Sequence, residues 1–176
     1  MADPLLSRHI TDSRELAERA RPPRNKPGVR RIFVTTYLRR PLPEVYAFFC
    51  DAHNLAAITP PELEFQILSP QEAGTDDPDL LDYRLKVRGV PLRWRTRILR
   101  RAPNAGFVDE QARGPFSLWH HTHTFTDEGD RVRMDDEVIY RLPLWPLGDI
   151  AAPWVKRELD RLFEFRTRRI REIFGE

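Results

Sequence analysis

Residues Leu118 to Leu142, LWHHTHTFTDEGDRVRMDDEVIYRL, decide the fold. Apolar and polar side chains alternate through Leu118–Thr126 and again through Arg131–Leu142, and the residues from Asp127 to Asp130 join the two segments. A period of two residues predicts strands with one buried face, and a short polar junction predicts an antiparallel hairpin. The sequence therefore predicts a sheet with one wet face at this point.

The phase of each strand predicts which side chains face inward. In the first segment we expect the larger, more aromatic set to face the core, which is Trp119, His121, His123 and Phe125. In the second segment the inward set is Val132, Met134, Asp136, Val138 and Tyr140. For Phe107–Ala112 the phase is open, and we favour Asp109 and Gln111 inward because Glu110 would then meet the arginines of the preceding strand.

The rest of the chain predicts an α+β fold around this hairpin. Apolar residues from Ile150 to Phe174 recur at helical spacing, which indicates one long amphipathic C-terminal helix that lies on the sheet. Two short helices follow the first strand, within residues 43–58, and residues 70–79 read as a solvated loop. The seven predicted strands span residues 29–39, 63–68, 81–88, 92–98, 107–112, 118–126 and 131–142.

Length, charge and cysteine content limit the class of protein. The chain has 176 residues, a net charge of +2 and a single cysteine, Cys50. These numbers predict one domain without a disulfide framework, and without a signal sequence or membrane span we expect it in the cytoplasm. We divide the chain into a basic, proline-rich, flexible leader (1–28) and one ligand-binding domain (29–176).

Several motifs resemble those of the START-like (SRPBCC, helix-grip) superfamily, and within it the bacterial ligand-binding SRPBCC domain group. They are PEVYAFF at 43–49, NL at 54–55 with ITP at 58–60, DYRL at 82–85 with RGVPLRW at 88–94, FVDEQ at 107–111, GP at 114–115, WHHTH at 119–123 and DEVIY at 136–140. The resemblance covers residues 30–174. It implies a curved sheet wrapped around the long C-terminal helix, a cavity between them and a START-like domain at 29–176.

The inward faces combine an apolar lining with a small polar patch. An apolar pocket that contains a few convergent polar groups is typical of a small-molecule site. We therefore predict a hydrophobic or amphipathic ligand, either lipid-like, polyketide-like or aromatic. The predicted ligand-binding residues are Tyr83, Trp94, Asp109, Gln111, Trp119, His121, His123, Met134, Asp136, Tyr140 and Trp154.

The polar patch admits four interpretations. It forms a structural His–Asp network that fixes strand register, or it orients the polar head of a ligand. It supplies acid/base catalysis of a cyclase or dehydratase type, with His121, His123 and Asp136 as candidates, although no motif demands catalysis. Last, His121, His123 and a carboxylate would suit a metal ion, but the His-x-His pattern is common in strands, so we assign no metal. We assign no cofactor and no catalytic residue either.

A basic hairpin offers an alternative interaction surface. Residues 84–101 contain eight Lys or Arg and no acid. We expect a solvated sheet face neutralised in part by Glu110, Asp135 and Glu137, or weak contact with an anionic membrane. Nucleic acid is not expected, because Trp94 faces the other way. The residues placed on this outer face are Arg84, Lys86, Arg88, Arg93, Arg95 and Arg97.

Overall fold

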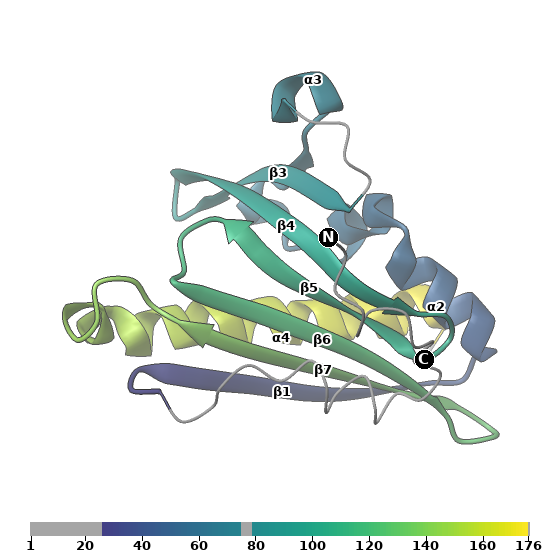
Figure 1. Cartoon of the computed structure of the whole chain (residues 1–176). Coiled ribbons are helices and arrows are strands. Elements are labelled where there is room, and N and C mark those ends of the chain that lie inside the picture. Colours follow the sequence, from purple (N-terminus) through teal and green to yellow (C-terminus); the bar gives the residue numbers. More distant parts are fainter. Residues whose placement is uncertain (1–25, 75–78, 176) are drawn as a thin grey trace, which may run out of the picture.

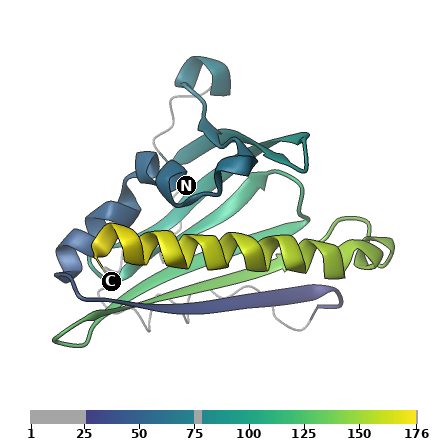
Figure 2. The same ribbon diagram turned by 180° about the vertical axis from the view of Figure 1, so that it is seen from behind.

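The computed structural model describes residues 26–74 and 79–175. Its seven strands form one antiparallel sheet in the order β1-β7-β6-β5-β4-β3-β2, and the long helix α4 (Ala152–Phe174) crosses one face of it (Figures 1 and 2). Residues 1–25 of the expected leader lie outside the described residues. The strands are β1 (Val29–Leu38), β2 (Gln66–Ile67), β3 (Leu80–Val87), β4 (Val90–Ala102), β5 (Gly106–Arg113), β6 (Leu118–Asp127) and β7 (Val132–Arg141).

The segment between β1 and β3 departs from the prediction in detail. The first expected helix is α2 (Leu42–Cys50), but the second is the 3-10 helix η2 (Ala52–Ile58). Asp51 adopts an extended conformation and its side chain accepts from the His53 backbone N–H, which ends the α-helix. A further 3-10 turn, η3 (Pro61–Leu63), and a left-handed Glu64 shorten the expected strand at 63–68 to β2. The short helix α3 (Pro70–Ala73) occupies the start of the expected solvated loop.

Helix α4 packs on the sheet through one apolar stripe. Its buried side chains Leu159, Phe163, Ile170 and Phe174 recur at helical spacing, and Gly175 ends the helix with a φ of 79°. The prediction that Ile150 belongs to this stripe is wrong, because Ile150 lies in the 3-10 turn η4 (Leu147–Ala151) and is 84% exposed.

Two apolar clusters join α4 to the sheet. One contains Phe107, Phe125 and Met134 from the sheet together with Ile170 and Phe174, and the other contains Trp94, Trp119, Val138 and Tyr140 with Leu159 and Phe163. The phases predicted for β6 and β7 are confirmed, because Trp119, Phe125, Met134 and Tyr140 all lie in these clusters.

The opposite face of the sheet is not uniformly wet, contrary to the prediction. His120, Thr122, Thr124 and Glu137 are buried there. The Nδ1 atom of His120 lies 2.6 Å from a Glu110 carboxylate oxygen, and a similar distance joins Arg31 to Glu137. Pairing with Glu110 and Arg31 therefore allows His120 and Glu137 to be buried on this face too.

Candidate ligand-binding site

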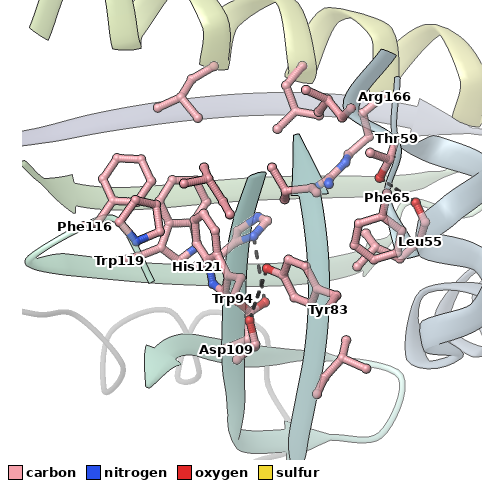
Figure 3. Close-up of a pocket in the computed structure, with 18 of the residues that line it drawn as sticks. Leu55, Thr59, Phe65, Tyr83, Trp94, Asp109, Phe116, Trp119, His121 and Arg166 are labelled. Atoms are coloured by element: carbon pink, nitrogen blue, oxygen red, sulfur yellow. Dashed lines mark hydrogen bonds and ion pairs between the residues drawn. The ribbon is translucent and has the colours of Figure 1, made fainter. Parts of the chain in front are cut away.

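A cavity of about 760 Å³ lies between α4, the β3–β4 hairpin and the η2–η3 segment (Figure 3). Alternate residues of β3 and β4 face it, which confirms the period-two interpretation of both strands. Apolar side chains make up most of its wall. Those contributed by the hairpin are Leu81, Tyr83, Leu85, Val87, Val90, Leu92, Trp94 and Ile98, with Thr96 among them. Leu80, the first residue of β3, also lines the cavity and is the exception to the alternation.

Aromatic rings build one wall of the cavity. The Trp94 ring stacks on Tyr83 at 5.9 Å and meets Trp119 edge-on at 5.1 Å, while Phe116 lies 4.9 Å from Trp119. Gln111 holds Phe116 in place, because its amide donates to the Phe116 carbonyl oxygen at 2.7 Å and accepts from the Phe116 backbone N–H. Large rings that pack edge-to-face form a rigid apolar surface.

Four polar side chains meet at the base of the cavity because of strand register. Asp109 of β5 is paired with His121 of β6, and His123 of β6 is paired with Asp136 of β7. Asp109 Oδ2 lies 3.2 Å from His123 Nε2 and 3.8 Å from His121 Nδ1. Asp136 Oδ1 lies 2.6 Å from His123 Nδ1 and 3.3 Å from His121 Nε2, although neither contact has hydrogen-bond geometry. The structure thus confirms the inward phase of Asp109.

The charges of this cluster are set by burial and by mutual attraction. Burial acts to lower the pKa of His123, but Asp136 and Asp109 outweigh it and raise that pKa to about 9. Burial lowers the pKa of His121, with help from the neighbouring His123 charge. Burial opposes ionisation of Asp136 and Asp109, yet the histidines hold the pKa of both carboxyls below the ordinary value. At neutral pH the cluster therefore holds two carboxylates, one imidazolium and one neutral imidazole.

Two further polar groups point into the same space. Burial raises the pKa of Tyr83, so its hydroxyl, 3.4 Å from Thr96 Oγ1, stays protonated. Arg166 of α4 reaches into the cavity near Tyr83 (Figure 3), and its buried Nε has no hydrogen-bond partner among the described residues. Sequence reasoning missed Arg166, although it follows Phe163 by three residues and so continues the apolar stripe of the helix.

The structure brings together seven of the eleven predicted ligand-binding residues. Tyr83, Trp94, Asp109, Trp119, His121, His123 and Trp154 line the cavity. The other four, Gln111, Met134, Asp136 and Tyr140, do not line it. Met134 and Tyr140 are packed into the apolar clusters, Gln111 holds Phe116, and Asp136 lies behind the histidines.

The basic hairpin finds partners other than those expected. Lys86 pairs with Glu64 at 2.6 Å and Arg95 with Asp82 at 2.8 Å, so the expected partners Glu110, Asp135 and Glu137 are wrong for these two cations. Arg88 does not lie on the outer face, because its guanidinium reaches Glu158 of α4 at 2.8 Å. Membrane contact through this hairpin stays a prediction.

The mouth of the cavity carries exposed apolar side chains. Val90 at the tip of the hairpin, Leu144 before η4 and Trp154 at the start of α4 all line the cavity and are exposed. The Arg88–Glu158 ion pair joins the hairpin tip to α4 beside them. Within residues 26–74 and 79–175, none of the helices combines the length and the apolar character that a membrane span requires.

The sheet, the long helix and the cavity between them define a START-like, helix-grip protein. Residues 38–165 match the model of the family described as polyketide cyclase / dehydrase and lipid transport, and the chain belongs to this family. The family match supports a ligand-binding or a cyclase role for this chain. No curated protein sequence matches the chain.

Solved structures share the fold at low sequence identity. A START superfamily protein from Mycobacterium smegmatis has a TM-score of 0.60 and 15% identity, over 81% of this chain and 98% of that one. The Zhui aromatase/cyclase from Streptomyces sp. R1128 has a TM-score of 0.63 and 16% identity, over 81% and 91%. TTHA0849 from Thermus thermophilus has a TM-score of 0.61 and 18% identity, over 80% and 97%. At these identities the likeness concerns the fold alone.

Proposed function

We propose that this protein binds a hydrophobic or amphipathic small molecule in the cavity between the sheet and α4. The apolar cavity of about 760 Å³ carries this proposal. Its volume lies within the range of about 300–1,000 Å³ that small-molecule sites occupy. A wall of this kind favours apolar ligands, since each 100 Å² of apolar surface removed from water contributes about 2.5 kcal/mol.

The polar groups of the cavity select the head of that ligand. Arg166 and the protonated Tyr83 both offer donors, and the Nε of Arg166 is buried without a partner among the described residues. A buried donor without a partner costs about 1–3 kcal/mol, which a ligand acceptor would recover. We therefore expect a ligand whose head carries acceptor oxygens, such as a carboxylate, a phenolate or a ketone, and whose body lies along Trp94 and Trp119.

Mass spectrometry of the gently purified protein tests this proposal. We expect a non-covalent adduct in the native spectrum and its release on denaturation. Leu162→Trp, which enlarges a side chain that lines the cavity, should abolish the adduct. Arg157→Trp places the same ring on an exposed position of α4 and should retain it. If wild-type protein neither carries an adduct nor takes up a fluorescent fatty acid, or if Leu162→Trp binds as well, the proposal is wrong.

A cyclase or dehydratase is the second candidate, because His121 and Asp109 line the same cavity and would touch a bound ligand. The same experiment separates the two roles. A binding protein returns an added polyketide-like ligand unchanged, and a dehydratase returns it lighter by one water. A cyclase that loses no water returns an isomer of the same mass, which chromatography separates from the starting ligand. Loss of that conversion in His121→Gln, with the adduct still present, would assign the chemistry to the polar cluster.

A further inference from the structure

The polar cluster has the composition of a three-residue metal site. Asp109, His121 and His123 each offer one ligand atom, and the three atoms lie within 4.8 Å of one another. Asp109 Oδ2 is 3.2 Å from His123 Nε2 and 3.8 Å from His121 Nδ1. We propose that these residues bind a divalent first-row transition metal ion of the Zn²⁺ type, which displaces the His123 proton to solvent as it binds.

The distances fit such an ion after small side-chain adjustments. Zinc lies at about 2.0–2.2 Å from histidine nitrogen and carboxylate oxygen, so ligand atoms around a tetrahedral ion are about 3.4 Å apart. The separations from Asp109 Oδ2 to the two histidine nitrogens, 3.2 and 3.8 Å, lie on either side of this value, and all three ligand atoms lie within 4.8 Å of one another. All three residues line the cavity, so the remaining coordination positions would face the ligand space and accept water or a ligand oxygen.

Asp136 lies where an outer-shell residue of a metal site is expected. It contacts His123 Nδ1 and His121 Nε2, which are the ring nitrogens opposite those that face Asp109. A carboxylate behind a metal-bound imidazole orients the ring and raises its basicity as a ligand. Asp136 is 2% exposed and Asp109 lines the cavity, so two carboxylates would balance the charge of a divalent ion at this site.

Packing holds both imidazoles in place before any ion binds. The Phe107 ring stacks on the His123 ring with their centroids 4.2 Å apart. The centroid of the His121 ring lies 3.8 Å from that of His123 and 5.9 Å from that of Phe163. Strand pairing fixes the backbone of Asp109 opposite His121. Ligands held on strands and locked by packing lose little freedom on binding a metal.

The positive charge of Arg166 should weaken metal binding, so the direction in which its removal changes the metal affinity tests the proposal. Its charge acts on Asp109 from across the cavity, so it competes with the metal for that carboxylate. Removing this like charge with Arg166→Gln should therefore tighten metal binding, by about three- to tenfold. A network that only fixes strand register would show no metal binding to tighten.

Cobalt titration of the chelator-treated full chain tests the proposal. We expect one Co²⁺ per chain, with the strong visible absorption of a four- or five-coordinate ion. Asp109→Asn should weaken binding at least tenfold, and Asp136→Asn about tenfold. His53→Ala is the control, because His53 is exposed beside Asp51 and outside the cavity; it should leave the titration unchanged. No visible absorption from wild-type protein, or an unchanged affinity in Asp109→Asn, would overturn the proposal.

A second measurement avoids dependence on variants that do not fold. An anomalous difference map from wild-type crystals soaked in Zn²⁺ should show a peak about 2.0–2.2 Å from the three ligand atoms. A peak only at exposed sites such as His53 refutes the assignment. The outcome is independent of the proposed organic ligand, because Leu162→Trp should lose the ligand and still bind Co²⁺.

Discussion

Replacing Asp136 by alanine removes the carboxylate behind both cavity histidines. The side chain is 2% exposed, and its Oδ1 lies 2.6 Å from His123 Nδ1. Removing one partner of a buried ion pair costs about 3–5 kcal/mol, because the other charge stays buried. We expect the lower end of this range, about 3 kcal/mol, because Asp109 still lies 3.2 Å from His123 Nε2.

Urea and thermal unfolding measure this loss. For a chain of this size each kcal/mol lowers Tm by about 2–4 °C, so Asp136→Ala should melt about 6–12 °C below wild type. Asp160→Ala is the matched control, because it removes an exposed pair with Lys156 and should cost less than about 1 kcal/mol. A loss below about 1 kcal/mol for Asp136→Ala, or an equal loss for Asp160→Ala, would refute the view that the cluster is held by buried charge.

Three further changes test the packing around the cavity. Arg88→Ala breaks the exposed pair with Glu158 that joins the hairpin tip to α4, so we expect a loss of less than about 1 kcal/mol in stability but two- to fivefold faster release of a fluorescent fatty acid; unchanged release in stopped flow would mean that this pair does not slow the exit of a ligand. Ile170→Ala empties a fully buried site and should cost about 2–5 kcal/mol in urea unfolding, whereas a loss under about 1 kcal/mol would mean that α4 is loosely packed. Gly148→Ala would place a Cβ in steric conflict with the Pro143 carbonyl oxygen, so the loop at the mouth must shift and Tm should fall; a wild-type Tm would show that the loop adapts freely.

Alternation along β6 and β7 was sufficient to orient their side chains. Trp119, His121, His123 and Asp136 lie on the predicted face because side chains along a strand alternate with a period of two residues, and no packing choice changes it. The inward phase favoured for Asp109, from the charge of its neighbour Glu110, is also confirmed. These orientations follow from the period-two alternation along a strand, which can be read from neighbouring residues in the sequence.

The position of α4 over the sheet decides which inward residues line the cavity and which are packed in the apolar core. Met134 and Tyr140 share the face of His121, but they pack against other apolar side chains and leave no room for a ligand. Arg166 lies on the apolar stripe of the helix, yet its side chain lines the cavity together with residues of the β3–β4 hairpin (Figure 3). Neither outcome follows from periodicity.

Ion-pair partners were the least predictable feature. Arg88 reaches Glu158, seventy positions away in the chain, and Lys86 reaches Glu64. Both contacts depend on loop conformations, such as the positive φ of Arg88 and of Glu64, that composition does not determine. Long charged side chains also have many rotamers of similar energy, so their partners are selected by what lies within reach.

The amino-acid sequence by itself determined six of the seven strands, the inward faces of β6 and β7, the long C-terminal helix and the family, because periodicity and local motifs are properties of neighbouring residues. Strand phase already predicted that Asp109, His121 and His123 share one patch, and only the tertiary structure decided that Arg166 joins them at one end of an apolar cavity. That convergence depends on the register of three strands and on the position of α4 over them. Long-range packing sets the strand register and the position of α4, and a local sequence pattern does not determine either.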